Sequence, residues 1–482
     1  MKALILIFSL LILHGCNQVK NQKEDAHIPE YTFLKQDSTV NPKIRGIWKS
    51  IGNGYLLDAR GDSILLYSYT KSFCYKEKND YLEGLLNSQS RFFRRGDTLG
   101  IYLTDYGDKT ANIQTKKDFV SLNAFPSDYV SFSEMQGMEP GELFDLFIET
   151  MEENYAFSRE RDLDWKVIGR DYKSKISNGT TTEELFQLIG EIVTLTKDHH
   201  TKIINEDGRA LQYRGTPSAE IVIDSFNNQS DVKSLDEFFD IYFSHNYKNI
   251  SDSLLQGKGR KVANGKLEWG SLNERIGYIN IHSFAGFGSG ISRKQQIDSV
   301  NFHMKNIIEA LKNKDAIILD VGFNFGGYDA SGLTIAGYFT DKAVHAYTSQ
   351  VYNDGEFYNE SEINVFPAEK VNYTKPVYLL MTDISRSAAE SFAMMMNALP
   401  NVKLVGTNTL GILSGMLGKS IGPFYSTSSN QRLLASDSTF YEVSGVEPDL
   451  KLTVFPRENV FNGHKQAVRE LIATIEKNEQ RR

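Results

Sequence analysis

Cysteine is almost absent from this chain, because only Cys16 and Cys74 occur among its 482 residues. A small disulfide-held scaffold would need several cysteines in an even set, so that class of protein is excluded. If Cys16 is modified, Cys74 has no partner within the chain. Cys74 stands in an aromatic, alternating stretch and is therefore expected to be a small buried residue.

The chain also lacks an excess of positive charge. Its 53 Lys and Arg residues face 61 Asp and Glu residues, which gives a net charge of −8. Because proteins that bind nucleic acids carry clustered positive charge, this balance argues against a nucleic-acid partner. After residue 16, the histidines outside one adjacent pair show no metal-ligand spacing, so neither a metal nor another cofactor is expected; these are His27, His245, His282, His303, His345 and His464.

Long apolar runs are missing except for one at the start of the chain. Lys2 is followed by an apolar run from Ala3 to Leu13, and then by Leu13-His14-Gly15-Cys16. The run is too short to span a bilayer as a mature helix and is typical of a secretory signal. Leu-x-Gly-Cys resembles a bacterial lipoprotein signal, which implies cleavage before Cys16, a lipid on that cysteine and a place in the cell envelope outside the cytoplasm. The alternative is a cleaved signal without an anchor.

Changes of pattern divide the chain into seven expected segments. They are a signal (1–16), a polar tether (17–45), a small β domain (46–136), a helical segment (137–205), a variable insert (206–270), an α/β core (271–470) and a charged tail (471–482). In the β domain, apolar runs flank the turn signal Arg60-Gly61-Asp62, which predicts an antiparallel hairpin. In the helical segment, Thr180 to Glu183 is a capping-box signal for the start of a helix.

From Gly277 onward the pattern alternates between strands and helices. Strands are expected over 277–283, 316–321, 377–381 and 402–406, and helices over 300–311, 329–339 and 391–399. Such alternation implies a largely parallel sheet. The expected fold is therefore an α/β core, with a helical segment before it and a small N-terminal antiparallel β domain.

Ser387 is the first candidate for chemistry. It follows the expected strand 377–381 and a turn-like stretch, and it precedes a good helix former. A strand, a tight turn and a serine at a helix start are a recurring way to hold a nucleophile beside free backbone N–H groups. Ser387-Ala388-Ala389-Glu390 is also a helix capping box, so a purely structural N-cap remains the alternative.

The turn from Asp320 to Asp329 is the second candidate, because it contains the paired glycines Gly326 and Gly327. Paired glycines let the backbone approach a ligand closely, and N–H groups ahead of a helix favour negative charge. The turn is not a phosphate loop, since no Gly-Lys-Ser/Thr follows, and its glycine spacing is not the dinucleotide fingerprint. A turn needed only for chain geometry remains the alternative.

The third candidate is the sequence Asp198-His199-His200-Thr201. Histidine is the usual base for a serine nucleophile, because its pKa lies near neutrality. Two adjacent histidines cannot both point into one site from a helix or strand. A structural pair, a catalytic base and a metal ligand all remain open on these residues alone.

Taken in order, these features resemble the C-terminal processing peptidase family of serine peptidases, and most closely its tricorn-like and interphotoreceptor retinoid-binding-protein-like branch. The likeness covers roughly Glu139 to Val454, with no convincing PDZ insert. Family members show Lys/Asn-Asp-Gly-His-Thr at Lys197 to Thr201 and Asp-x-Arg-x-Asn-x-Gly-Gly at Asp320 to Gly327. They show Ser-Ala-x-Glu at Ser387 to Glu390 and Gly-Val-x-Pro-Asp at Gly445 to Asp449. The resemblance implies a core of the ClpP/crotonase type.

The family has two catalytic solutions. One branch uses a lysine about 25 positions after the serine, where this chain has Ile412, and neither Lys403 nor Lys419 fits that place. The tricorn-like branch uses a histidine, which matches His200, and a glutamate that falls on Glu442. The resemblance thus implies a Ser387–His200 pair assisted by Glu442, although a solvated carboxylate is the alternative for Glu442.

The roles that the resemblance implies are those of a serine peptidase acting on a polypeptide substrate. His200 would take the proton of Ser387, and the backbone N–H groups of Ala388 and of Gly326 or Gly327 would hold the oxyanion. His199 and Asn324 are candidates for an assisting role. The chain departs from the family at Gly322, where an arginine is usual, and at His199, where a small residue is usual. A catalytically silent member that binds a peptide or an apolar ligand is the second hypothesis.

Overall fold

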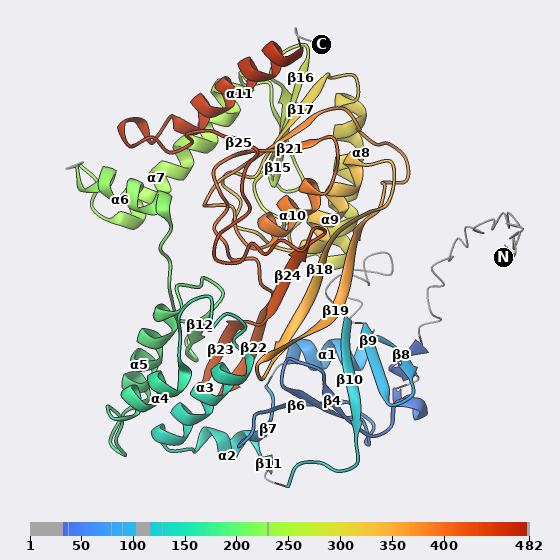
Figure 1. Ribbon diagram of the computed structural model, residues 1–482, viewed down its shortest axis with the longest axis vertical. Coiled ribbons are helices and arrows are strands. Elements are labelled where there is room, and N and C mark those ends of the chain that lie inside the picture. Colours follow the sequence, from blue (N-terminus) through green and yellow to red (C-terminus); the bar gives the residue numbers. More distant parts are fainter. Residues whose placement is uncertain are drawn as a thin grey trace, which may run out of the picture.

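The computed structural model describes residues 32–36, 38–78, 80–88, 90–102, 116–127, 129–228 and 231–479. Figure 1 shows an α/β core at one end of the molecule, with a helical part and an N-terminal β part side by side at the other. Cys16 and the signal segment lie outside the described residues. Within the described ranges, no helix has the length and apolar character needed to cross a membrane.

The N-terminal β part is a nine-stranded sheet with the order β1-β8-β9-β10-β4-β5-β6-β7-β11. The hairpin expected around Arg60-Gly61-Asp62 is confirmed, since β5 and β6 pair in an antiparallel way. Cys74 is buried, as expected, and burial raises the pKa of its thiol to about 11. The strands and the one helix are β1 (Thr32–Phe33), β4 (Ile47–Ser50), β5 (Tyr55–Asp58), β6 (Leu65–Tyr69), β7 (Cys74–Lys76), α1 (Asp80–Ser88), β8 (Arg91–Arg95), β9 (Thr98–Tyr102), β10 (Lys116–Leu122) and β11 (Tyr129–Val130).

The expected polar tether is shorter than predicted. Residues 32–36 and 38–44 are already part of the β region, where β2 (Lys35–Gln36) pairs with β3 (Thr39–Val40). Leu34, Val40 and Ile44 are buried in its core. Three apolar side chains scattered through a polar stretch suffice to anchor it, because each packs into the same hydrophobic cluster.

The helical part consists of α2 (Phe132–Gln136), α3 (Pro140–Asn154), α4 (Trp165–Lys173) and α5 (Thr182–Leu195). The capping box predicted near Thr181 is present, because the Thr181 side chain accepts from the Glu184 N–H. After α5 the chain enters β12 (Lys202–Ile204), which lies between β13 (Ala210–Gln212) and β23 (Phe424–Ser429). β23 also pairs with β22 (Met416–Ile421), so a late segment of the chain returns to this part.

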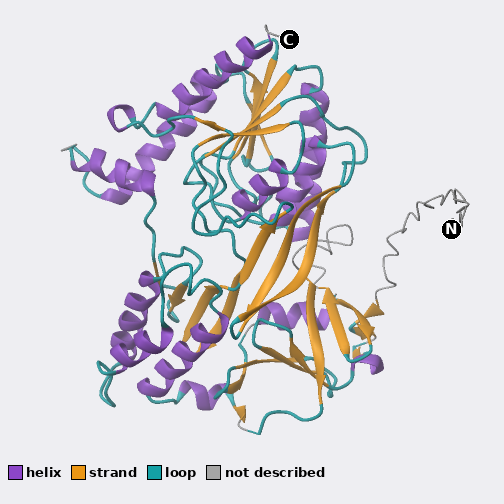
Figure 2. Cartoon of the chain, viewed as in Figure 1, coloured by secondary structure: helices purple, strands orange, loops and turns teal. Residues whose placement is uncertain are grey.

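The core is a seven-stranded sheet with the order β14-β15-β16-β17-β20-β21-β25. The pairs from β16 to β25 are parallel, as the strand–helix alternation predicted. Helices cover both faces of the sheet (Figure 2). Its strands are β14 (Arg260–Val262), β15 (Leu267–Ser271), β16 (Ile276–Ile281), β17 (Ala316–Asp320), β20 (Val377–Met381), β21 (Val402–Gly406) and β25 (Leu450–Lys451).

Two hydrophobic clusters fix these layers. One joins the sheet to α8 (Arg293–Leu311), α9 (Asp329–Ala336) and α10 (Ala388–Asn397). The other joins its opposite face to α6 (Pro217–Asn227), α7 (Leu235–Lys248) and α11 (Gly463–Glu479). The strands of a parallel sheet carry apolar side chains on both faces, so both faces must be covered by helices.

Two segment interpretations need correction at this point. The expected variable insert, 206–270, contributes helices and strands to the core, because aromatic residues of α7 such as Phe238 and Tyr242 are fully buried against it. The expected charged tail from 471 onward is helical through Glu479 and buries Leu471 and Ile475. In both segments, a few apolar residues among many polar ones pack against the core. The average composition of the segment does not reveal them.

A sheet of two long strands and one shorter strand connects the core with the rest of the molecule (Figure 1). β18 (Val344–Asn353) pairs with β19 (Glu356–Val365) on one side and with β24 (Gln431–Ala435) on the other. This antiparallel sheet was not expected, because the surrounding sequence alternates between strands and helices and so predicts parallel strands.

A buried lysine ties the N-terminal β part to β22. Lys419 donates from Nζ to the Gly54 carbonyl at 2.5 Å and to the Ser68 hydroxyl at 3.1 Å. Its ammonium group lies 3.6 Å from the Tyr55 ring centroid. Burial lowers the pKa of Lys419 to about 7, against an opposing contribution from the Glu77 carboxylate.

We expect Lys419→Ala to lower the free energy of unfolding by about 3 kcal/mol or more, because it leaves a cavity and removes the cation near a buried carboxylate. Urea unfolding monitored by circular dichroism measures the change. Lys403→Ala is the matched control, since Lys403 is exposed. Equal losses in the two variants would show that Lys419 does not hold the two parts together.

Candidate active site

Ser387 lies between β20 and α10, at the carboxyl end of a central strand. It is the N-cap residue of α10, but its φ of 59° and ψ of −125° are far from the extended backbone of an ordinary N-cap. Thr181, the N-cap of α5, has a φ of −74°. Because a positive φ strains a serine and is not needed for capping, this backbone points to a function for the exposed part of the half-buried side chain.

Two acceptors hold the strained Ser387 backbone. Its N–H lies 3.1 Å from the Ile412 carbonyl and 3.1 Å from Oε2 of Glu390. The fully buried Glu390 carboxylate also accepts from Thr409, Gly411 and Ile412. Burial raises the pKa of Glu390 to about 7. Glu390 thus fixes the loop beside the nucleophile as well as the nucleophile itself.

The paired glycines pack directly against Ser387. A Cβ at Gly326 would lie 2.8 Å from the Ser387 Cβ and 3.0 Å from the Ala388 nitrogen. A Cβ at Gly327 would lie 2.5 Å from the Phe284 carbonyl carbon. Both glycines have positive φ, at 96° and 143°. Only glycine permits this approach, so the turn needs both residues for steric reasons as well as for conformation.

The three expected oxyanion donors are not equivalent. The Gly326 N–H already donates to Oδ1 of Asn324 at 2.8 Å. Within the described part of the chain, the N–H groups of Ala388 and Gly327 have no such acceptor. Asn324 is fully buried and donates from Nδ2 to the Ile281 carbonyl at 2.7 Å. Asn324 therefore shapes the turn, and the Ala388 and Gly327 N–H groups remain available to a ligand.

A buried polar cluster supports the start of this turn. Asp320 accepts from the Gly322 N–H at 2.9 Å and contacts Nε2 of His464 at 2.6 Å. It also accepts from the Tyr278 hydroxyl. A Cβ at Gly322 would lie 3.1 Å from Oδ1 of Asp320, which leaves little room for a side chain at this position. His464 belongs to α11, so the last helix of the described chain fixes the turn.

His200 stands just after α5, on the stretch that leads into β12. Its N–H donates to Oδ1 of Asp198 at 2.8 Å, and its carbonyl accepts from Thr427 of β23 at 2.6 Å. The ring is buried, and its Nδ1 has no hydrogen-bond partner. Burial lowers the pKa of His200, although the charge of Asp198 opposes the shift. The imidazole is therefore neutral near pH 7 and able to accept a proton.

His199 makes different contacts. One ring nitrogen, Nε2, lies 2.9 Å from the Gly215 carbonyl, and Nδ1 lies 3.3 Å from the guanidinium of Arg386. Since a carbonyl only accepts and a guanidinium only donates, the ring is a neutral Nε2–H tautomer. Burial lowers the pKa of His199 to about 4. With both nitrogens engaged, His199 positions Arg386, the residue before Ser387.

Glu442 lies in the same buried region. Its Oε2 accepts from the N–H groups of Leu413 and Ser414, at 2.8 and 3.0 Å. Its Oε1 lies 3.6 Å from Arg161 and has no hydrogen-bond partner. Burial first, and then repulsion by Asp198, raises the pKa of Glu442 well above its usual range. A solvated carboxylate is therefore excluded.

The structure thus groups most of the candidate residues. Gly326, Gly327 and Ala388 surround Ser387, and His199 joins the histidine pair to the nucleophile through Arg386. The Ser414 backbone lies next to both Glu442 and the His200 ring. Arg161 and Arg386 were not found from the sequence, because a single arginine in a polar turn carries no spacing signal. Ile412, at the place of a lysine base, offers only its carbonyl to Ser387.

Comparison with known proteins fits this geometry. The model of peptidase family S41 matches residues 275–452, and that of the tricorn protease C1 domain matches residues 138–194. These matches support a serine peptidase of the S41, or C-terminal processing peptidase, family. The two matches cover the core with Ser387 and the helices before His200.

Two known proteins show the extent of the likeness. The carboxy-terminal processing protease CtpA of Bacillus subtilis (strain 168) is 30% identical over 187 residues, which are 37% of this chain and 35% of the relative. The chain therefore spans about a third of the length of that relative. A crystal structure of a protein from Parabacteroides merdae ATCC 43184, described as a peptidase, superposes with a TM-score of 0.56 at 20% identity. It covers 70% of this chain and 96% of that one, which establishes a shared fold.

Proposed function

We propose that this S41 member is a serine endopeptidase that hydrolyses peptide bonds through Ser387 and His200. The observation that carries the proposal is the strained Ser387 next to two unengaged backbone N–H groups, those of Ala388 and Gly327. Strain of this kind persists where a function requires it. The buried neutral ring of His200, which lies within the electrostatic influence of Arg386, is the base in this proposal.

The proposed reaction follows from these positions. His200 takes the proton of the Ser387 hydroxyl as the oxygen attacks the peptide carbonyl carbon. The Ala388 and Gly327 N–H groups hold the oxyanion of the tetrahedral intermediate. His200 then gives the proton to the leaving amine, and water cleaves the acyl-enzyme by the reverse sequence. Glu442 and Arg161 orient the loop at Ser414 that borders the His200 ring.

The location and substrates are part of the same proposal. A lipid on Cys16 would place the enzyme on the outer side of a bacterial membrane, where exported polypeptides are the available substrates. The lipoprotein-like sequence Leu13-His14-Gly15-Cys16 supports this. Metabolic labelling with an alkyne fatty acid, with Cys16→Ser as the control, tests the anchor independently of activity.

Covalent labelling tests the catalytic proposal. A fluorophosphonate probe should label the chain without Cys16 and its preceding residues, and Ser387→Ala should abolish labelling. Ser391→Ala is the matched control, since Ser391 lies one turn further along α10 and is fully buried. If the wild type neither reacts with the probe nor cleaves fluorescent casein, the enzyme proposal fails and the binding protein takes its place.

The pH profile of kcat/KM should identify the base. Only the neutral imidazole accepts the proton, so activity rises as the pH increases through the pKa of His200. Because burial lowers that pKa below the ordinary value of 6.5, we expect the acid limb to have its midpoint below pH 6.5. A midpoint near 7 would instead indicate deprotonation of Glu390, whose pKa is raised to about 7. Rates of casein cleavage between pH 4 and 9 distinguish the two.

A further inference from the structure

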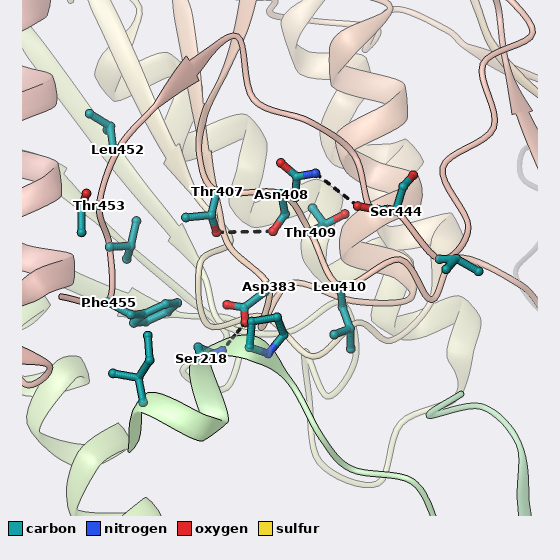
Figure 3. Close-up of a pocket in the computed structure, with 14 residues that line it drawn as sticks. Ser218, Asp383, Thr407, Asn408, Thr409, Leu410, Ser444, Leu452, Thr453 and Phe455 are labelled. Carbon is teal, nitrogen blue, oxygen red and sulfur yellow. Dashed lines mark hydrogen bonds between the residues drawn. The ribbon is translucent and has the colours of Figure 1, made fainter. Parts of the chain in front are cut away.

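A pocket of about 440 Å³ lies beside the site, at the carboxyl edge of the parallel sheet. Its wall contains residues that directly follow three adjacent strands: Asp383 after β20, Thr407 to Leu410 after β21, and Leu452 to Phe455 after β25. The start of α6 closes one side (Figure 3). In open parallel sheets this edge is where ligands bind, and the volume is that of a small-ligand or side-chain site.

Asp383 is the only charged residue among those that line the pocket. The other lining residues are neutral, and most of them are apolar or carry a hydroxyl; they include Ile221, Leu410, Val443 and Phe455. Figure 3 shows the Asp383 side chain at the centre of the lining residues, next to Ser218. Asp383 therefore gives the pocket a single negative group among apolar and neutral polar side chains.

Only one oxygen of the Asp383 carboxylate has a hydrogen-bond partner within the described residues. One oxygen, Oδ2, accepts from the Ser218 N–H, and this bond caps the start of α6. The other oxygen, Oδ1, is buried without a hydrogen-bond partner, and the residue as a whole is 8% exposed. No Lys or Arg pairs with Asp383 within the described ranges. A buried carboxylate oxygen without a donor is unfavourable, and a ligand with an N–H donor would remove the cost.

We propose that this pocket binds an ammonium or guanidinium group on an aliphatic stem, with Asp383 as the recognition residue. The stem would lie along the apolar wall, and the cation would donate to Oδ1 in a charge-assisted hydrogen bond. A basic side chain of the polypeptide substrate has this chemistry, and so does a free amine. The first source rests on the proposed peptidase function, whereas the binding site itself does not.

The pocket shares a loop with the nucleophile. Thr409 lines the pocket and also donates to the Glu390 carboxylate, which in turn accepts from the Ser387 N–H. Further along the same loop, the Ile412 carbonyl accepts from the Ser387 N–H. Val443, also in the lining, follows Glu442 and has a φ of 72°, a strained value for a β-branched residue. A ligand in the pocket therefore contacts the elements that position Ser387 and Glu442.

Calorimetry on the Ser387→Ala protein tests the site without turnover. Nα-acetyl-lysine amide should bind about tenfold or more tightly than Nα-acetyl-norleucine amide, which has a similar stem without the charge. Asp383→Asn should remove this preference, since asparagine can still accept from the Ser218 N–H but carries no charge. Asp341→Asn, at an exposed carboxylate, should keep it. Equal binding of the two compounds, or no binding of either, overturns the proposal without relying on a substitution in the pocket.

A peptide series distinguishes the two sources. Lysine is exchanged for norleucine at each position around a scissile bond, and kcat/KM is measured for wild type and Asp383→Asn. If wild type prefers lysine at one position and Asp383→Asn does not, the pocket binds a substrate side chain. If no position shows a lysine preference but Nα-acetyl-lysine amide binds in the calorimeter, the ligand is a free amine. If wild type cleaves no peptide, the peptidase function fails, and calorimetry still decides the site.

Discussion

Replacing His200 by glutamine is expected to lower kcat by about 10⁴-fold or more, with a much smaller change in KM. Glutamine is close to histidine in size but cannot take the proton of Ser387 at neutral pH. The buried ring contributes its base to the transition state and little to substrate binding, so the loss should appear in kcat. Steady-state cleavage of a quenched fluorescent peptide measures both constants.

His199→Gln is the control for this prediction. His199 is an immediate neighbour of comparable burial, but its nitrogens are occupied by Gly215 and Arg386. We expect this variant to lose far less activity, since it alters the position of Arg386 and not the proton transfer. If His199→Gln is inactive and His200→Gln is active, the general base is His199 and not His200.

Gly326→Ala is expected to lower kcat by about 10²- to 10³-fold, the size of effect seen when an oxyanion donor is lost. The new methyl group would lie 2.8 Å from the Ser387 Cβ and 2.8 Å from the Arg386 carbonyl, so the turn and the nucleophile must move apart. The movement displaces the Gly327 N–H from the oxyanion. The free energy of unfolding should also fall, because alanine is strained at a φ of 96°.

Gly355→Ala separates these two effects. Gly355 has a φ of 92°, almost the same as Gly326, but a Cβ there meets no atom within 4 Å. The Gly355→Ala variant should lower the free energy of unfolding, because alanine is strained at this φ, but it should leave kcat unchanged. If Gly326→Ala retains full activity at the same stability loss as Gly355→Ala, close contact of the turn with Ser387 is not required for catalysis.

The sequence predicted the core of this fold with good accuracy, because its strands are short apolar runs between clear turn signals. The strands expected over 377–381 and 402–406 are present with those limits as β20 and β21. The helix expected over 300–311 begins earlier, at Arg293, where a Ser292–Gln295 capping box starts it. Local patterns of this kind depend on neighbours in the chain, and these are what a sequence displays.

Features that depend on distant pairing were not predictable in the same way. β12 pairs with β23, about 220 residues later, and no local signal marks that partnership. The same limit applies within the site. The candidates Gly326 and Gly327 could not be ranked as donors until Asn324 was seen to occupy the Gly326 N–H. Arg161 and Asp383 became visible only through burial and missing partners.

The link between α11 and the glycine turn has a consequence for biosynthesis. Asp320 and His464 are 144 residues apart in the chain, and their contact is fully buried. A ribosome makes roughly 5–20 residues per second, so the turn exists for many seconds before its support is made. A nascent chain can therefore fold its early sheet but cannot set the oxyanion geometry. Proteolytic competence is therefore expected to arise only after α11 has been synthesised, so the earlier part of the chain is inactive while it is being made.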